Sequence, residues 1–215
     1  SVLRENLINF IWKNDELPKE QPDSIEYDII DSRYSDLDNL KQIDKFNIVM
    51  EYKINSVAYL FLSEKNKQQL VIYQQGHFGD FIIGKHVIQS LINDGYSVLA
   101  FSMPLYGMND QPIADIPGKG KIKFLTHNDF YIIDTNDFSS IKFFFEPIVK
   151  SLNYIEDKYT FDSIHMVGVS GGGWTTAYYS AIDERINFSY SIAGMYPEYL
   201  KQMANSAHYE RTTSQ

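Results

Sequence analysis

Short apolar runs of strand length recur along the chain after its first third, with helical stripes between them. The runs cover residues 70–73, 97–101, 164–167 and 186–193. Between the first two runs, the apolar side chains of residues 81–92 recur at the spacing of one helix face, and an Asn-Asp-Gly sequence typical of a helix end follows. Two strands joined through a helix run parallel, with a right-handed crossover. The pattern therefore predicts an α/β fold with a mostly parallel sheet flanked by helices.

The first third of the chain follows a different pattern. Residues 46–53 and 56–62 alternate between apolar and polar positions and are rich in β-forming residues, which predicts an antiparallel hairpin. Residues 7–12 can form a short amphipathic helix, and residues 27–30 can form a short strand. We therefore expect an N-terminal antiparallel hairpin ahead of the parallel part of the sheet.

Further helices are expected in the second half of the chain. Residues 141–155 carry an apolar stripe at helical spacing, and Pro147 inside the stripe should kink the helix or move its start to a later residue. Residues 174–182 predict another helix, and residues 198–204 have a helical pattern as well. This order of elements adds strand–helix–strand units to the one described above.

The amino-acid composition and the net charge exclude several kinds of partner and of catalytic chemistry. Of the 215 residues, 44% are hydrophobic, which is enough for one domain with a real core, and the formal net charge is −9. An acidic protein repels phosphate backbones and anionic lipid heads, so we expect neither nucleic acid nor a membrane as a partner. The chain has no cysteine, which excludes disulfides, thiolate catalysis and cysteine zinc sites. No histidine or aspartate cluster has the spacing of metal ligands, and we expect no cofactor.

One segment has an arrangement suited to nucleophilic chemistry. Residues 164–174 contain the pattern Gly-x-Ser-x-Gly as Gly168, Ser170 and Gly172, after an apolar strand and before a helix. In this arrangement the serine lies on a tight, strained strand-to-helix turn that projects its Oγ above the sheet. The glycines are needed because side chains at their positions would collide with the neighbouring strand and helix. We therefore expect Ser170 to be a nucleophile.

Other glycine-rich patterns fit this segment less well. A phosphate-binding P-loop needs Gly-Lys-Ser/Thr at its end, and Trp174 follows the glycines instead. A dinucleotide-binding fingerprint needs a second glycine where Ser170 stands. A glycine-rich turn around a buried, inert serine is the structural alternative.

An acyl-transfer enzyme must also stabilise the oxyanion of its tetrahedral intermediate. One donor would be the backbone N–H of the residue after the nucleophile, here Gly171, and the other would come from the loop after an earlier strand. The sequence Gly76-His77-Phe78 follows the run at residues 70–73. We expect the backbone N–H of His77 to be the second donor, with Phe78 as the alternative. The imidazole of His77 can in addition line the pocket.

Taken together, these segments resemble the α/β-hydrolase superfamily. The matching segments are the Gln-Gly-His loop at residues 75–77, the strand and loop at 96–104 and the Gly-Val-Ser-Gly-Gly turn at 168–172, spread over residues 46–197. Within the superfamily, the chain looks most like acyl esterases and dienelactone-hydrolase-like proteins. The resemblance implies a Ser–acid–His triad in that chain order, which cleaves an ester or related acyl bond of a small-molecule substrate.

The resemblance also suggests how the chain is organised. We expect a single domain over residues 1–215, with an N-terminal extension (1–45), the first strands and the oxyanion loop (46–108), a lid-like excursion (109–139) and the region of the nucleophile (140–215). The excursion is rich in proline and glycine, and a connection of this length is typically functional or mobile. The side chains expected to line an apolar acyl pocket are Phe78, Tyr106, Met108 and Trp174.

The family pattern is incomplete in this sequence. The triad acid and histidine normally follow later strands, and the roughly 20 residues after residue 193 cannot hold two more strands and a helix. We therefore expect the C-terminal strands, the acid and the histidine to lie outside this chain. Glu198 with His208 is a formal substitute. His86 and His165 fit structural positions, and His127 lies in the excursion.

Two functions are consistent with this sequence. One is a serine hydrolase that acts through Ser170 and a backbone oxyanion hole. The other is a catalytically inert or truncated hydrolase-fold protein that serves as a binding module, because a serine without its base is a weak nucleophile. An incomplete sheet would expose an edge and an apolar face, which favours self-association or a missing C-terminal segment as the partner.

Overall fold

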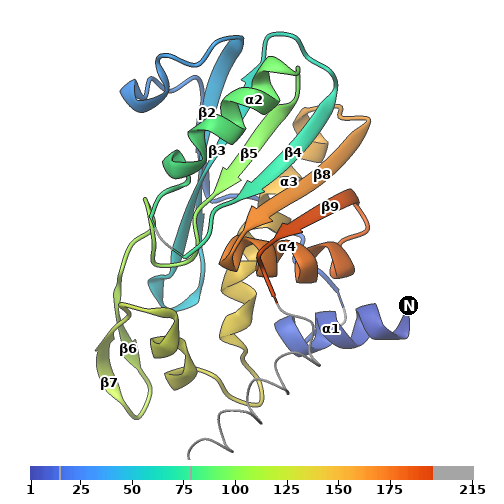
Figure 1. Ribbon diagram of the computed structural model, residues 1–215. Helices are drawn as coiled ribbons and strands as arrows, with labels where there is room; N and C mark the ends of the chain where they lie inside the picture. The colour runs from blue at the N-terminus through green and yellow to red at the C-terminus, as the bar shows by residue number, and fades with distance from the viewer. Residues whose placement is uncertain (15, 78, 196–215) are drawn as a thin grey trace, which may run out of the picture.

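A twisted sheet organises the described part of the chain, which in this computed structural model comprises residues 1–14, 16–77 and 79–195 (Figure 1). Within these residues seven strands form the sheet in the order β1-β2-β3-β5-β4-β8-β9. The strands are β1 (Ser24–Glu26), β2 (Leu40–Val49), β3 (Asn55–Ser63), β4 (Gln69–Gln74), β5 (Ser97–Phe101), β8 (Ser163–Val169) and β9 (Ile186–Ile192). The strands from β5 through β4 and β8 to β9 pair in parallel, whereas β1, β2, β3 and β5 pair antiparallel. The predicted α/β fold, with an antiparallel hairpin ahead of the parallel strands, is confirmed.

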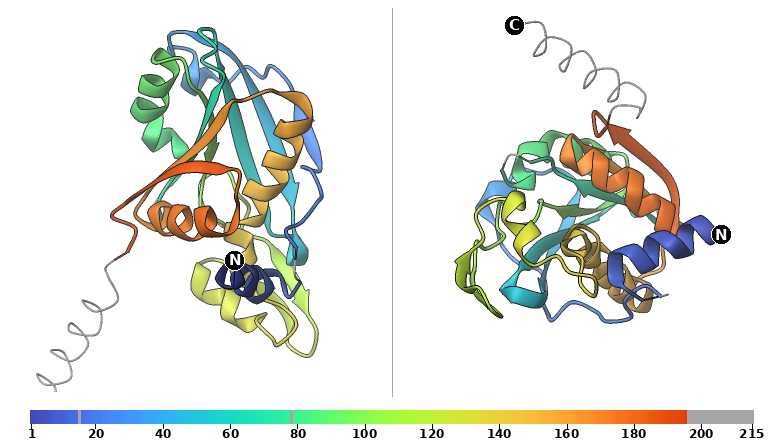
Figure 2. Two further views of the ribbon diagram at one scale, coloured as in Figure 1. Left: turned by 90° about the vertical axis from the view of Figure 1, so that its right-hand side faces the viewer. Right: turned by 90° about the horizontal axis from the view of Figure 1, so that it is seen from below.

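Helices cover both faces of this sheet (Figure 2). The α-helices are α1 (Val2–Trp12), α2 (Lys85–Asn93), α3 (Glu146–Lys158) and α4 (Gly171–Ile182). Helix α2 lies on one face, and α1, α3 and α4 lie on the other (Figures 1 and 2). None of the helices in the described residues is long and apolar enough to cross a membrane.

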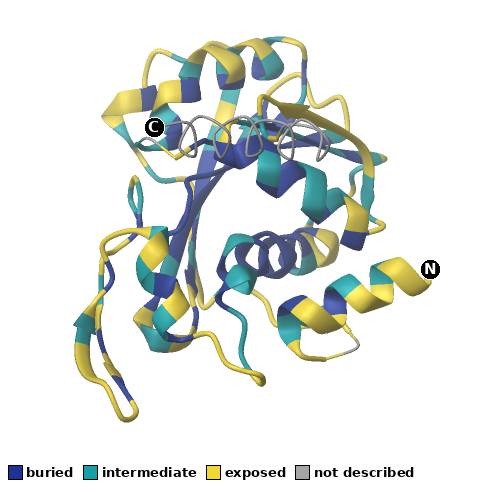
Figure 3. Cartoon of the chain, turned by 60° about the horizontal axis from the view of Figure 1, so that its bottom comes forward, coloured by how far each residue is buried: buried dark blue, intermediate teal, exposed yellow. Residues whose placement is uncertain are grey.

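Alternating side chains along the strands build the two layers of the core. In β4, Leu70 and Ile72 belong to the larger apolar cluster, which contains side chains of α1, α3 and α4. Tyr73, the residue after Ile72, points to the opposite face and belongs to the smaller cluster together with Ile88 and Ile92 of α2. The central strands are buried along most of their length (Figure 3), because successive side chains point to opposite faces and both faces are covered. Burial of β4 on both faces explains why its sequence is a continuous apolar run.

Two strand predictions near the N-terminus were wrong in their bounds. The strand predicted at residues 27–30 lies at 24–26 instead, because Asp28 adopts a left-handed conformation with φ of 49°. The N–H of Asp28 donates to the buried carboxylate of Asp44 at 2.9 Å, which holds the chain away from strand geometry. The strand predicted at 46–53 ends at Val49, since the short 3₁₀ turn η2 (Glu51–Lys53) follows it.

The two helices expected to flank β5 and β8 begin later than their apolar stripes. The segment predicted as a helix from residue 81 starts with a 3₁₀ turn, η3 (Phe81–Gly84), so that Ile88 rather than Val87 faces the sheet. The stripe from residue 141 starts with η5 (Ser140–Phe144), and α3 then begins with Pro147 in its first turn. The later start expected from Pro147 is confirmed, because proline needs no hydrogen-bonded N–H in a first helical turn.

The excursion after β5 has an ordered structure of its own. It contains the hairpin of β6 (Ile113–Ile116) with β7 (Gly120–Lys123), followed by the 3₁₀ helix η4 (His127–Ile132). These elements lie beyond the carboxyl ends of the parallel strands (Figure 1). The helix predicted at residues 198–204 lies outside the described residues.

Candidate active site

Ser170 lies at a tight turn between β8 and α4. Its backbone has φ of 56° and ψ of −121°, a combination that side-chain-bearing residues rarely adopt and that costs about 1–3 kcal/mol. The N–H of Ser170 donates to the carbonyl of Ile192 at 2.8 Å, and its own carbonyl accepts from the N–H of Trp174 at 3.1 Å. Ser170 is exposed. Hydrogen bonds on both sides thus hold a strained turn whose side chain faces solvent.

The glycines of the motif allow three segments to meet below Ser170. A Cβ on Gly168 would lie 2.2 Å from the carbonyl oxygen of Gly172, and a Cβ on Gly172 would lie 2.1 Å from the carbonyl oxygen of Gln74. Non-bonded carbon and oxygen atoms do not approach this closely. The end of β8, the start of α4 and the end of β4 can therefore pack together only with glycine at these positions.

The loop after β4 passes over the same turn. A Cβ on Gly76 would lie 2.8 Å from the carbonyl oxygen of Val169 and 3.1 Å from Cβ of Ser170. The next residue, His77, is exposed beside Ser170 and Gly171 in one cavity. The structure thus brings together His77, Ser170 and Gly171, which the sequence placed in one site. Phe78, the alternative donor, lies outside the described residues.

A cavity of about 410 Å³ opens at Ser170 and has mainly apolar walls. The residues that line it are His77, Met103, His127, Phe144, Ser170, Gly171, Trp174, Ala193 and Gly194. Trp174 was expected here. Met108 was not correctly placed, because its sulfur accepts from Arg33 at 3.1 Å instead. Tyr106 is absent from the lining, but its ring contacts that of His127 at a centroid distance of 5.2 Å.

His127 lines the cavity as well, although the sequence did not indicate it. It begins η4 in the excursion, and its Nε2 lies 2.8 Å from the carbonyl oxygen of Pro104. Since a carbonyl only accepts, Nε2 carries the proton. Burial lowers the pKa of His127, the hydrogen bond to Pro104 opposes this effect, and the nearby His77 lowers the pKa further. We therefore expect a neutral imidazole in a fixed tautomer at neutral pH.

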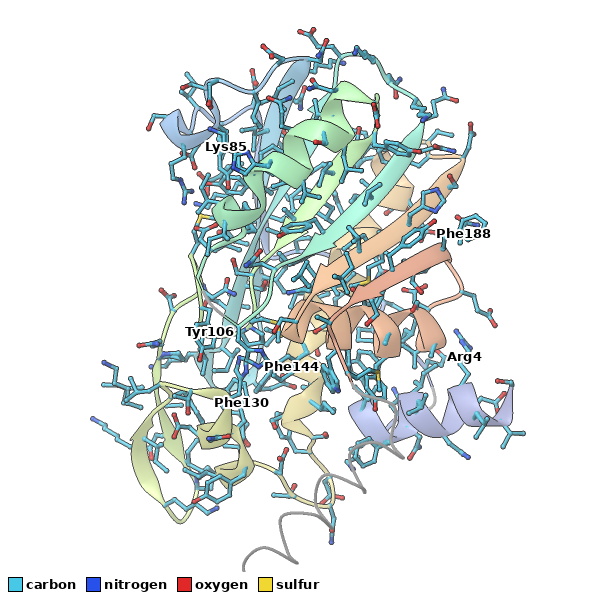
Figure 4. The ribbon with its side chains drawn as sticks, viewed as in Figure 1. Arg4, Lys85, Tyr106, Phe130, Phe144 and Phe188 are labelled. Carbon is cyan, nitrogen blue, oxygen red and sulfur yellow. The ribbon has the colours of Figure 1, made fainter. Side chains whose placement is uncertain are left out.

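Aromatic rings pack around His127 and hold this side of the cavity in place. Its ring lies 4.8 Å from that of Phe144 and 5.8 Å from that of Phe130, as measured between centroids. Phe144 in turn meets Trp174 edge-on at 5.6 Å. Figure 4 shows Tyr106, Phe130 and Phe144 gathered at this end of the molecule. The excursion and the segment before α3 thus form one side of the cavity.

The lining contains a limited set of groups that can take up a proton. Within the described residues these are the imidazoles of His77 and His127, and no carboxylate lines the cavity there. His86 is exposed on α2. His165 on β8 pairs through Nε2 with the Ser163 hydroxyl at 3.1 Å, and burial lowers its pKa, which fits the structural position expected for it. Glu198 and His208 lie outside the described residues.

An ion-pair cluster holds the loop that carries His77 against the N-terminal segment. Arg33 bonds the carboxylate of Asp31 and also that of Asp80 at 2.9 Å. Asp80 caps η3 through the N–H of Ile82. The hydrogen bonds from Arg33, against some burial, lower the pKa of Asp31 to about 2. Residues 31–33 therefore anchor the far end of the loop that begins at Gly76.

Comparison with solved structures identifies the architecture. The chain superimposes on acetyl xylan esterase 1 from Thermoanaerobacterium sp. with a TM-score of 0.65 at 16% sequence identity, over 87% of this chain and 57% of that one. It superimposes on the esterase Pf2001 from Pyrococcus furiosus with a TM-score of 0.53 at 16% identity, over 83% of this chain and 58% of that one. An acetyl xylan esterase from Paenibacillus sp. gives a TM-score of 0.56 at 13% identity.

These similarities concern the fold. No protein-family model and no curated protein sequence matches the chain. The chain spans a little over half the length of acetyl xylan esterase 1 and of Pf2001, at 57% and 58%. The described residues therefore have an α/β-hydrolase-type fold, and the strand–turn–helix with Ser170 lies in it where the sequence predicted.

Proposed function

We propose that this chain, with its α/β-hydrolase-type fold, is the part of a serine hydrolase that carries the nucleophile. Ser170 attacks the carbonyl carbon of an ester or related acyl bond, and the backbone N–H groups of His77 and Gly171 receive the developing oxyanion. The proton of Oγ passes to a histidine base, as nucleophilic serine chemistry requires. The observation that carries the proposal is the strained, exposed turn of Ser170 at the mouth of an apolar cavity.

The walls of the cavity suit the acyl side of the substrate. Phe144, Trp174 and Met103 present apolar surface beside Ser170, and hydrophobic surface of this kind fixes small ligands while a few polar groups orient them. The compared acetyl xylan esterases make short-chain esters and acetylated sugars the first substrates to test. The excursion at 109–139, which supplies His127, would act as a partial lid. Its replacement should change substrate preference without unfolding the domain.

A binding module without chemistry is the second candidate. It is favoured by the absence of a carboxylate among the described residues that line the cavity, because a triad needs an acid to orient its histidine. In that case the cavity would hold an acyl group or a related ligand without cleaving it.

A covalent probe separates the two candidates. The chain, Ser170→Ala and the control Ser189→Ala, an exposed serine on β9, would be treated with a fluorophosphonate and analysed by intact mass. An adduct on the chain and on Ser189→Ala, but not on Ser170→Ala, is expected of the hydrolase. If the unmodified chain remains unlabelled while circular dichroism shows it folded, Ser170 is idle in this chain, and the binding module is the better account of these 215 residues.

A further inference from the structure

The imidazole of His77 occupies the space beside the residue after the proposed nucleophile. A Cβ on Gly171 would lie 2.3 Å from both Cε1 and Nδ1 of that ring. Any residue with a side chain at position 171 would therefore displace the imidazole. Because Gly171 has none, the ring of His77 can lie close to the backbone of Gly171, whose N–H is one of the proposed oxyanion donors.

A second imidazole restricts the ring of His77 from another side. The centroids of the His77 and His127 rings are 5.2 Å apart, with an interplanar angle of 57°. His127 is itself fixed by its bond to the carbonyl of Pro104 and by its contact with Phe144. The His77 ring is thus bounded by Gly171 and by a packed aromatic wall, yet His77 remains exposed to the cavity. This arrangement positions the ring in advance of substrate binding.

The chemistry of imidazole suits a donor at this place. Both the neutral and the protonated ring carry at least one N–H, so the group can donate a hydrogen bond in either state. The titratable groups that face it within the described residues are His127 and, behind it, Tyr106. No carboxylate lines the cavity in that part of the chain, so none is placed there to take up the N–H of His77.

We infer that the side chain of His77, and not only its backbone N–H, donates a hydrogen bond to the oxyanion formed at Ser170. This inference rests on the proposed hydrolase function and assigns a catalytic residue to it. When Oγ of Ser170 bonds to the acyl carbon, the carbonyl π electrons move onto the oxygen, and the N–H of His77 stabilises that charge without transferring its proton. The C=O bond forms again as the bond to the leaving oxygen breaks, and the alcohol leaves with the proton that the histidine base took from Oγ.

The test uses the second-order rate of fluorophosphonate labelling, across about pH 5 to 9. In this reaction Oγ bonds to phosphorus, fluoride leaves with the hydroxyl proton, and the phosphoryl oxygen takes the place of the oxyanion. Three variants change the donor: His77→Leu removes it, His77→Gln keeps an N–H donor without a basic nitrogen, and Gly171→Ala displaces the ring. His86→Gln, on the exposed face of α2, is the control.

The expected pattern distinguishes a donor from a base. His77→Leu and Gly171→Ala should label about 10²–10³ times more slowly, the usual cost of removing one oxyanion donor. His77→Gln should retain a rate within about tenfold of the unmodified chain, with the same pH profile, because an amide N–H replaces the imidazole N–H. His86→Gln should behave as the unmodified chain does.

Three results would overturn the inference. If His77→Leu labels at the unmodified rate, only the backbone of His77 acts, and the proposed function stands. If His77→Leu and His77→Gln are equally inactive and the acid limb of the pH profile disappears, His77 is a proton acceptor, and the proposed function again stands. If the unmodified chain is not labelled at all, the proposed function fails for this chain and the inference fails with it. Circular dichroism of each variant excludes unfolding as the cause.

Discussion

Around Ser170, close contacts between backbone atoms decide which residues fit. The carbonyl oxygens of Gln74 and Gln75 lie 2.1 and 2.7 Å from where a Cβ on Gly172 would be. Both are backbone atoms at the end of the central strand β4, so they cannot move aside as a flexible side chain would. Gly172 is therefore a packing requirement of the turn as well as part of a motif.

A single methyl group at this position should be costly. We expect Gly172→Ala to lower the free energy of unfolding by about 1–3 kcal/mol, the usual cost of overpacking a tight site. Urea unfolding followed by circular dichroism measures the change. Ala181→Ser, on the exposed side of the same helix, should stay within about 0.5 kcal/mol of the unmodified chain. An unchanged stability of Gly172→Ala would contradict the close packing described here.

Single residues also show what the sequence could reveal about the site. The spacing of Gly168, Ser170 and Gly172 was enough to place the turn, because a local strand–turn–helix leaves a local pattern. His127 left no such pattern: it reaches the cavity because η4 folds back onto Pro104, a contact 23 residues away in the chain. Contacts that depend on the path of an irregular segment are not encoded in periodicity.

At the scale of elements, the loop after β4 connects the N-terminal segment to the cavity. Arg33 bonds Asp31 beside η1 (Ser32–Tyr34) and Asp80 ahead of η3, and Lys85 at the start of α2 donates to the carbonyl of Arg33 at 2.7 Å. Figure 4 shows Lys85 at this junction. The two ends of the loop are thus held by β4 and by these ion pairs. A substitution in residues 31–33 should therefore change the position of His77.

The free energy of unfolding at acidic pH tests whether the ion pairs of Arg33 with Asp31 and Asp80 anchor the loop. The pKa of Asp31, about 2 in the folded chain, lies below its ordinary 3.8, so the unfolded chain binds the proton more readily. The stabilisation is fully present above the ordinary pKa and is lost as the pH falls from about 4 towards 2. Asp31→Asn should therefore show a shallower loss of unfolding free energy between about pH 5 and 3 than the unmodified chain. Asp110→Asn, at an exposed position, is the control, and equal slopes for Asp31→Asn and the unmodified chain would refute the anchor.

The ends of helices and strands could be predicted from the sequence to different degrees. Pro147 gave the start of α3 because a missing N–H has one favourable place in a helix. No comparable residue marks the starts of β2 and α2, and both predicted starts were wrong. Strand β2 begins at Leu40, and a 3₁₀ turn precedes α2. Apolar side chains precede α2 in η3, whereas residues 41–45 at the start of β2 are mostly polar, so the apolar pattern marked neither boundary.

At the scale of the whole molecule, β9 lies at one edge of the sheet that the described residues form, and its side chains are unusually distributed. Phe188, Tyr190 and Ile192 are 64%, 60% and 50% exposed, on the sheet face that also carries α2. On the opposite face, the hydroxyl of Ser191 donates to the carbonyl of Gly173 at 2.8 Å in α4. Figure 4 shows Phe188 at this outer edge. These three large side chains thus face solvent, whereas Ser191 faces the helix and Ile186, at the start of the strand, packs against the larger core cluster.

This surface should dominate the binding of hydrophobic dyes. We expect the double variant Phe188→Ser and Tyr190→Ser to bind markedly less anilinonaphthalene sulfonate than the unmodified chain. Its unfolding free energy should change by less than about 1 kcal/mol, because both side chains are already mostly in water. Tyr131→Ser, which is 74% exposed on η4, is the control and should leave dye fluorescence unchanged. Equal dye binding by the double variant would show that the apolar surface lies elsewhere.

The pairing of β4 with β8 has a consequence for the order of events during synthesis. Gln69 of β4 pairs with Ser163 of β8, so the loop with His77 meets the turn of Ser170 only after the intervening segments have left the ribosome. Parallel pairs between such distant strands form slowly, because the intervening chain must be closed into a loop first. The proposed nucleophile therefore meets the proposed donor at His77 only near the end of folding, and a growing chain would carry the serine without all the surroundings that could make it reactive.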